Sequence, residues 1–322
     1  MRVFVLGKPR EVTHWTEDCV AGLQAAGHEV ALGVTRDARL HPGLERLLMA
    51  SWTGAWPLRR LQRAIRDFRP DLILAVRAFA TPASMLDAVA AMAGRPPLVG
   101  WVGDSFSPAI RPIADRFDLL AYTDTAMLAL HQASGFRAGG LYLPHAANTR
   151  LLDGQDTAPA TGDGAQGVVF VANPTPRRRA TLAAMTQPVN LFGPGWTASP
   201  NVAHRIEARV VGVAELGRLY AGSAAVLNIH HEENVSHGLN QRHFDPALFG
   251  VPVLSDALAD LPRCFEPGRE VLVWDDIAAL NDLHQRVLRE PGWARAIGAA
   301  AQRRVMAEHL YGHRVETVRR AV

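Results

Sequence analysis

Residues 238–256 read Gly-Leu-Asn-Gln-Arg-His-Phe-Asp-Pro-Ala-Leu-Phe-Gly-Val-Pro-Val-Leu-Ser-Asp, and this stretch is the most informative part of the chain. Its polar start leads into a short predicted helix that ends at Gly250, because glycine adopts the left-handed conformation of a helix C-terminus at little cost. A buried strand is predicted at residues 251–254. Free N–H groups and the dipole at the start of such a helix attract phosphate, and the Arg242 guanidinium adds charged donors. The stretch therefore predicts an anion-binding corner that leads into a parallel sheet.

The same alternation of strand and helix runs along the whole chain. Apolar runs predict strands at residues 3–6, 30–34, 72–76, 98–102, 119–122, 168–171, 189–192, 224–229, 251–254 and 271–274. Amphipathic stretches predict helices at residues 16–26 and 59–68, and the run from about 293 to 320, rich in Ala, Arg and Glu, predicts the last helices. Strands that alternate with helices imply parallel sheets covered on both faces.

The length of 322 residues suits two domains of about 150 residues each. Residues 153–167 contain no aromatic or branched apolar residue and are the predicted linker. The predicted domains are therefore 1–152 and 168–305, with a C-terminal helix at 306–322 that packs back on the N-terminal domain. The fold class is α/β, with two doubly wound Rossmann-like domains that face a cleft and bind ligands at the carboxyl ends of their strands.

Composition describes an ordinary globular protein. The net charge is only +3, and Lys8 is the only lysine among the 34 basic residues. This balance is compatible with anionic substrates and does not require a polyanionic partner. Cys19 and Cys264 lie far apart without metal-ligand spacing, so we expect reduced, structural thiols and a cytoplasmic location. No apolar run reaches the roughly 18 residues of a membrane span.

A predicted helix over residues 59–69 displays five arginines opposite an apolar stripe. Such a face can bind an anionic membrane or nucleic acid, or it can be solvated while the apolar stripe packs on the sheet. The solvated face is the favoured interpretation. Nucleic acid is not expected as a partner, and a peripheral membrane contact stays open.

The motifs of the C-terminal half resemble the CgeB-like (spore-maturation-type) branch of the GT-B glycosyltransferases. They fall, in order, at residues 169–179, 227–230, 238–245 with Gly250, 265–271 and 308–314. The N-terminal half is similar through its opening strand, Trp101-Val102-Gly103-Asp104 and Leu143-Pro144-His145. The resemblance implies a GT-B fold and a hexosyltransferase-type enzyme. It also implies a nucleotide-diphosphate-sugar donor, with a UDP-sugar favoured, in the C-terminal domain, and an acceptor in the N-terminal one.

Carried over position by position, the resemblance also implies site residues. Asp245 takes the place of the carboxylate that grips the donor ribose. Arg178, with Arg179, falls where a basic residue meets the diphosphate, and Asn240 and Arg242 line the same corner. The remaining members of the predicted donor-binding set are Asn173, His230, Gly238 and Leu239.

Two positions depart from the pattern of related retaining enzymes. His237 stands where they often carry a glutamate, eight residues before the ribose carboxylate, and Asp245 is one methylene shorter than the usual glutamate. The sugar, the acceptor and the stereochemical outcome therefore stay open.

His14 is the candidate catalytic base because it follows the first predicted strand, where the sheet edge opens onto the cleft. Imidazole titrates near neutral pH and is able to deprotonate a hydroxyl. Asp104, which also follows a predicted strand, is the candidate carboxylate that orients it. The alternative is that His14 and Trp15 pack the loop.

A histidine-rich region invites a metal site, but its spacing argues against one. The histidines and acids in question are His230, His231, His237, His243, Glu232 and Glu233. The second histidine that a zinc-binding helix needs four residues on is absent, and GT-B enzymes generally manage leaving-group charge with dipoles and basic side chains. We therefore expect neither a metal nor a cofactor.

Two other functions stay open on the same scaffold. One is a nucleotide-sugar hydrolase or epimerase, and the other is a non-catalytic sugar-nucleotide or glycan-binding protein, because a fold alone does not fix function. For a transferase, the acceptor is a glycan, a protein or a small molecule.

Overall fold

The structure is a computed structural model that describes residues 1–9, 14–35, 55–103, 110–153 and 167–322. Its contacts divide the chain into unit 1, formed by Met1–Pro144 and Tyr311–Val322, and unit 2, formed by His145–Leu310. The corresponding boundaries predicted from the sequence are at 152 and 305, and most of the predicted linker lies outside the described residues.

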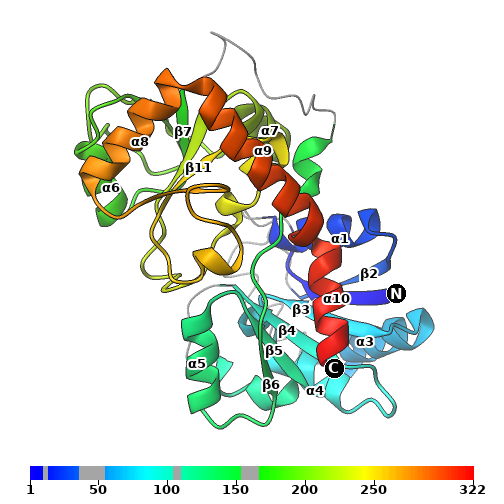
Figure 1. The fold of residues 1–322 in the computed structure, drawn as a ribbon. Coiled ribbons are helices and arrows are strands. Elements are labelled where there is room, and N and C mark those ends of the chain that lie inside the picture. Colours follow the sequence, from blue (N-terminus) through cyan, green and yellow to red (C-terminus); the bar gives the residue numbers. More distant parts are fainter. Residues whose placement is uncertain (10–13, 36–54, 104–109, 154–166) are drawn as a thin grey trace. The chain divides into compact units, whose positions relative to one another are not determined.

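Unit 1 is built on a six-stranded parallel sheet in the order β2-β1-β3-β4-β5-β6 (Figure 1). The strands are β1 (Arg2–Gly7), β2 (Glu29–Val34), β3 (Leu72–Val76), β4 (Leu98–Val102), β5 (Leu119–Tyr122) and β6 (Gly139–Tyr142). The helices are α1 (Trp15–Ala25), α3 (Ala55–Phe68), α4 (Ala83–Ala90), α5 (Thr125–Ala133) and α10 (Tyr311–Ala321). The strand order reverses between β1 and β3, so the connections leaving these two strands diverge.

Helix α10 belongs to unit 1, where it lies beside α1 (Figure 1). Gly22 allows the close approach, because a Cβ atom there would lie 2.5 Å from the Tyr311 ring. The Arg314 Nε group donates to the Pro144 carbonyl at 2.8 Å. The last helix of unit 1 is therefore held by both packing and a partly buried polar contact.

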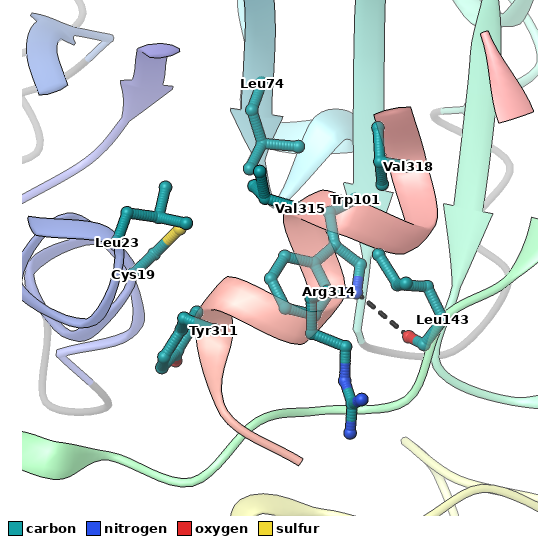
Figure 2. Close-up of a pocket in the computed structure, with 9 residues that line it drawn as sticks. All are labelled: Cys19, Leu23, Leu74, Trp101, Leu143, Tyr311, Arg314, Val315 and Val318. Atoms are coloured by element: carbon teal, nitrogen blue, oxygen red, sulfur yellow. Dashed lines mark hydrogen bonds between the residues drawn. The ribbon is translucent and has the colours of Figure 1, made fainter. Parts of the chain in front are cut away.

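Figure 2 shows the seam between α10 and the sheet of unit 1. Trp101 lies at its centre: the indole Nε1 donates to the Leu143 carbonyl at 3.1 Å, and the ring meets the Tyr311 ring edge-on at 6.0 Å. Cys19 is fully buried in the same seam, and burial raises the pKa of its thiol, so it is an unreactive core residue. The seam is interior packing rather than a ligand site.

Unit 2 contains a second six-stranded parallel sheet, in the order β12-β11-β10-β7-β8-β9. The strands are β7 (Val168–Val171), β8 (Val189–Phe192), β9 (Arg205–Glu207), β10 (Ala225–Asn228), β11 (Val253–Asp256) and β12 (Leu272–Trp274). The helices are α6 (Pro176–Ala183), α7 (Val213–Ala221), α8 (Ile277–Arg289) and α9 (Pro291–Glu308). Here the order reverses between β7 and β10.

Both faces of this second sheet are buried. Val226 and Val253 belong to one hydrophobic cluster, while their chain neighbours Leu227 and Leu254 belong to another. Successive strand side chains point to opposite faces, so near-continuous apolar runs are what a sheet covered on both sides requires.

The structure corrects the prediction for residues 240–256. The predicted short helix is instead two 3₁₀ helices, η5 (Gln241–His243) and η6 (Pro246–Phe249), because a proline in mid-segment interrupts helical hydrogen bonding. Gly250 ends η6 with φ 65°, as predicted. Strand β11 begins two residues later than predicted and runs on to Asp256, which places this carboxylate at the sheet edge.

Two strands were not predicted, namely β6 and β9. Each lies at an edge of its sheet and pairs on one side, so it needs no continuous apolar run.

None of the described helices is long and apolar enough to span a membrane.

Candidate functional site

The carboxyl ends of β7, β10 and β11 form the candidate site of unit 2. In open α/β sheets, ligands bind outside these ends at the point where the strand order reverses, which here lies between β7 and β10. Asn173 follows β7, His230 follows β10, and Asp256 ends β11. Because the three strands are neighbours and parallel, these residues meet at one edge.

Arg178, on the first turn of α6, bridges the two central strands at this edge. Its Nε donates to the Ile229 carbonyl at 3.1 Å and its Nη1 to the Asn173 carbonyl at 2.9 Å, and the residue is only 3% exposed. Burial, reinforced by the nearby Arg242 guanidinium, lowers the pKa of Arg178 to about 9. The side chain still carries its charge at neutral pH, and it positions the backbone that follows both strands.

Arg177 is the more accessible arginine at this edge, with a side chain 39% exposed. Its Nη2 donates to Asp256 Oδ2 at 2.9 Å, and its Nη1 lies 3.3 Å from His230 Nε2. His230 Nδ1 lies 2.5 Å from the same Asp256 oxygen. A His230 ring protonated on Nδ1 donates to Asp256 and accepts from Arg177, so the carboxylate and the imidazole together orient the guanidinium.

Arg179 is the third of three arginines in the first turns of α6. Its Nη2 donates to the Gly195 carbonyl at 3.2 Å, and its guanidinium lies 5.2 Å from the centre of the Trp196 ring. Thr175 caps the helix by accepting from the Arg178 backbone N–H. Cations disfavour a helix N-terminus, so this concentration of positive charge favours an anion nearby.

Asn240 and Arg242 reach the edge from the other side. The Asn240 and Asn228 amides bond to each other at 3.2 and 3.4 Å, and Arg242 Nε donates to Asn228 Oδ1 at 3.3 Å. Burial lowers the pKa of Arg242. The Asn240 side chain accepts from the Arg242 backbone N–H, so this N–H of η5 is already bonded within the chain. The anion-binding corner predicted here stays a prediction.

His243 is held neutral beneath this edge. Ser255 Oγ donates to the Asp256 carbonyl at 2.8 Å and lies 2.9 Å from His243 Nε2, while Asn228 Nδ2 lies 2.9 Å from Nδ1. A ring protonated on Nε2 satisfies both contacts. Burial lowers the pKa of His243 to about 3.

Asp245, predicted to grip the ribose, is 6% exposed and bonds inside unit 2. Its Oδ1 accepts from the Asn148 backbone N–H at 2.8 Å. Asn148 in turn caps the turn Thr149–Leu152, where Leu151 is fully buried. The carboxylate therefore anchors the segment through which the chain enters unit 2.

Gly238 and Leu239 are both buried, and the Leu239 side chain belongs to the hydrophobic core. Any contact of Leu239 with a donor would therefore use its backbone. Asn173 is exposed, with its carbonyl held by Arg178.

The candidate catalytic residues belong to unit 1. His14 precedes α1 with a left-handed backbone, φ 49°, and its Nδ1 lies 4.0 Å from Glu17 Oε1. Asp104, the predicted orienting carboxylate, lies outside the described residues. Among the described residues, Glu17 is the carboxylate found near His14. It was not predicted from the sequence, although it stands only three residues away.

In the described part of the chain, no group of three or more His, Cys, Asp or Glu side chains is arranged to hold a metal ion. His230 Nδ1 is instead bonded to Asp256, and His243 Nε2 is bonded to Ser255.

Three members of this site are not in the donor-binding set predicted from the sequence: Arg177, Asn228 and Asp256. The signal for Asp256 was present, because a polar Ser-Asp pair directly follows an apolar strand. Which of three consecutive arginines faces outward depends on how α6 packs, and this cannot be read from the residues alone.

Comparisons with known proteins agree with this architecture. A family model described as glycosyl transferase-like matches residues 177–320. No curated protein sequence matches the chain. Sucrose-phosphate synthase from Thermosynechococcus elongatus is 14% identical over 100% of this chain and 99% of that one, with a TM-score of 0.66.

Two further solved structures are similar to this chain at comparable sequence identity. HepE from Anabaena, in complex with UDP and glucose, is 13% identical over 100% of this chain and 99% of that one, with a TM-score of 0.68. UDP-GlcNAc 2-epimerase from Neisseria meningitidis, bound to UDP-GlcNAc, is 12% identical over 99% of this chain and 100% of that one, with a TM-score of 0.56. None of these comparisons indicates the CgeB-like branch, which stays a resemblance. The chain has the GT-B fold of glycosyltransferases, with two parallel α/β units of six strands each.

Proposed function

We propose that the protein is a glycosyltransferase that moves a hexosyl group from a UDP-sugar, held by unit 2, to an acceptor hydroxyl. The observation that carries the proposal is the cluster of Arg177, Arg178 and Arg242 at the edge where the strand order of unit 2 reverses. The similarity of residues 177–320 to glycosyltransferases supports it. The UDP and UDP-glucose complexes of HepE support the choice of donor.

The charges at this edge suit a diphosphate. The Arg242 guanidinium lies near enough to Arg178 to lower the pKa of Arg178, and burial removes both side chains from water. A bound anion relieves that repulsion. Arg177 offers the accessible guanidinium, and Asp256 and His230 hold it in a fixed orientation before the donor arrives.

In the reaction, the acceptor oxygen forms a bond to the anomeric carbon as the bond to the UDP oxygen breaks. Negative charge grows on the departing diphosphate, and fixed cations stabilise charge that develops in the transition state. Arg177 is the side chain we assign to that task, with Arg178 and Arg242 behind it. The acceptor proton passes to a base, for which His14 is the candidate. No metal is required in this scheme.

The test is calorimetric titration with UDP. Replacing Arg177 with Ala should weaken binding by about 1.5–3 kcal/mol, the usual contribution of a charged hydrogen bond. Asp256→Asn should weaken it less, because the guanidinium remains but loses its orientation. Arg289→Ala, at an exposed position on α8, is the matched control and should leave affinity unchanged.

Turnover assays with UDP-sugars complete the test. Activity should survive exhaustive chelation with EDTA, and a loss that Mn²⁺ restores would refute the metal-free scheme. Unchanged UDP affinity in both Arg177→Ala and Arg242→Ala would remove this edge from the proposal. Hydrolysis or epimerisation of the donor without any acceptor would replace transfer with the corresponding alternative.

A further inference from the structure

Unit 1 has its own point of strand-order reversal, between β1 and β3, and two cations stand there. The strands are parallel neighbours with Leu6 paired to Ala75. Lys8 is the first residue after β1, and Arg77 is the first residue after β3. Neighbouring strands lie about 4.8 Å apart, so the register brings these two residues to the same place at the carboxyl edge.

The choice of residue at position 8 is unusual for this chain. Lys8 is the only lysine in a sequence of 322 residues, in which every other basic residue except histidine is arginine. Lys8 is also partly buried rather than displayed on the surface. The compact ammonium of Lys8 and the forked guanidinium of Arg77 are two different kinds of phosphate donor.

The backbone of Arg77 is held in an unfavourable conformation. Its φ of 57° and ψ of 60° are left-handed, a region that costs a non-glycine residue about 1–2 kcal/mol. The guanidinium lies 5.4 Å from the centre of the Phe79 ring, which helps to hold it over the turn. Strain retained at a partly buried charged residue points to a functional role.

The other left-handed non-glycine residues support this location. In the described part of the chain they are His14 and Arg69. Arg69 ends α3 and bonds to the Ile65 carbonyl, which is an ordinary way to close a helix. His14 precedes α1 and comes after β1 in the chain. The left-handed residues that do not close a helix, His14 and Arg77, therefore both follow strands at the reversal point.

We propose that Lys8 and Arg77 bind a phosphate group of the acceptor, so that the acceptor is a phosphorylated hydroxyl compound. The proposal rests on the proposed function, because it takes the diphosphate of the donor to be held in unit 2. A phosphate monoester carries nearly two negative charges near neutral pH and thus matches two cations better than a carboxylate does.

The single lysine makes the test specific. Pyridoxal 5′-phosphate has an aldehyde that forms an imine with a lysine amine, with loss of water, and borohydride reduces this imine to a stable secondary amine. Peptide mapping then separates label at Lys8 from label at the Met1 amino group, which serves as an internal control. Glycerol 3-phosphate should protect Lys8 but not Met1, and glycerol at the same concentration should protect neither.

Two variants test the part played by Arg77. Arg77→Gly removes the side chain while suiting the left-handed backbone, so the protein should fold. In this variant, the concentration of glycerol 3-phosphate needed to protect Lys8 from labelling should rise about tenfold or more. Arg77→Lys should recover part of the protection. Arg63→Ala, on the exposed face of α3, should behave as wild type.

Each contrary result has a distinct meaning. Equal protection of Lys8 in wild type and Arg77→Gly, or none in either, would overturn the site. Protection by glycerate equal to that by glycerol 3-phosphate would overturn the choice of phosphate. Protection by UDP as strong as that by glycerol 3-phosphate would assign the cations to the donor. Failure of UDP to bind in calorimetry would refute the proposed function without altering the outcome at Lys8.

Discussion

Three consecutive arginines at the start of α6 occupy three different environments. Arg177 is accessible and paired with a carboxylate, Arg178 is buried against two carbonyls, and Arg179 lies over the Trp196 ring. The same substitution therefore has a different meaning at each position. At Arg178 it removes the donor from the buried Ile229 carbonyl and from the Asn173 carbonyl, which lowers stability. At Arg177 it removes the charge that we assign to the ligand.

His14 carries the first prediction at this scale. If it is the base, His14→Ala should lower turnover by about 10²–10⁴-fold and leave UDP affinity unchanged, because the donor is assigned to unit 2. Glu17→Gln should lower turnover less, since it only removes the nearby carboxylate. Near-normal turnover per folded molecule, together with a lower melting temperature, would instead show that His14 packs the loop.

His284 carries the second prediction, on the dependence of stability on pH. The residue is fully buried, and in the described part of the chain neither ring nitrogen has a hydrogen-bond partner. Burial, with a contribution from His204, lowers its pKa from 6.5 to about 4. Below pH 6.5 the unfolded chain therefore binds a proton that the native protein does not, and the free energy of unfolding falls.

The expected slope for one such histidine is about 1.4 kcal/mol per pH unit as the pH falls from roughly 6 to 4. His243, whose pKa is lowered to about 3, adds a slope of the same sign. Denaturant titrations at several pH values check this. His284→Leu should be less sensitive to acid than wild type, and identical slopes for the two proteins would contradict the prediction.

Many residues of the candidate site could be predicted from the sequence, but the contacts that each of them makes could not. The motif around residues 240–245 lies at the candidate sheet edge, where Arg178 and Arg242 also lie. Charge and spacing could not show that Arg178 would turn inward or that Asp245 would bond to Asn148. Both outcomes depend on contacts with residues that are far away in the sequence.

Among the elements, the segment formed by η5 and η6 has two sides. On one side, Asn240 and Arg242 meet Asn228 at the candidate site. On the other side, Asp245 holds the backbone of Asn148, and the Phe244 ring lies 5.3 Å from the ring of His309. The segment thus contacts both stretches of chain that adjoin the boundaries of unit 2.

Helix α9 fixes this segment through a glycine, which gives the third prediction. A Cβ atom added at Gly298 would overlap the Gly250 carbonyl oxygen at the end of η6, whereas one added at Gly292, in the first turn of α9, meets nothing within 4 Å. Gly298→Ala should lower the free energy of unfolding by about 1–3 kcal/mol, because the backbone must move.

The matched control is Gly292→Ala on the same helix. It should be neutral or should stabilise by up to about 1 kcal/mol, because alanine favours helix. Thermal or chemical unfolding of both variants decides the matter. Equal stability of the two variants would show that α9 and η6 are not packed as described.

Strongly apolar elements were predictable, and weakly patterned ones were not. Buried central strands such as β3 and β10 were recognised because a sheet covered on both faces requires continuous apolar runs. The edge strands β6 and β9 were missed because edge positions relax that requirement. The helix predicted after Asn240 failed because the influence of Pro246 outweighed the helical appearance of the surrounding residues.

At the scale of the whole molecule, the two units are not two consecutive halves of the chain. Unit 2 is one continuous stretch, whereas unit 1 is assembled from Met1–Pro144 and the distant helix α10. The buried side chains of α10 include Tyr311, Val315 and Val318. Each large apolar side chain of this kind contributes about 1.5–3 kcal/mol when it is removed from water.

The last prediction concerns removal of this helix. A chain that stops after Leu310 should lose the packing over Trp101, expose apolar surface in unit 1 and bind a hydrophobic dye such as ANS. Unit 2 should still bind UDP, because its sheet and the proposed donor residues remain intact. Deletion of residues 320–322 alone, all exposed, is the control and should change neither measurement. Loss of UDP binding in the longer deletion would show that unit 2 depends on α10.

The split of unit 1 also has a consequence for biosynthesis. Between Pro144 and Tyr311 the ribosome must add the 166 residues from 145 to 310. At about 5–20 residues per second this takes roughly 10–30 s. Throughout that interval the nascent N-terminal sheet has the surface around Trp101 uncovered, and unit 2 is complete before α10 is made. Unit 1, which is begun first, is therefore the unit that is completed last.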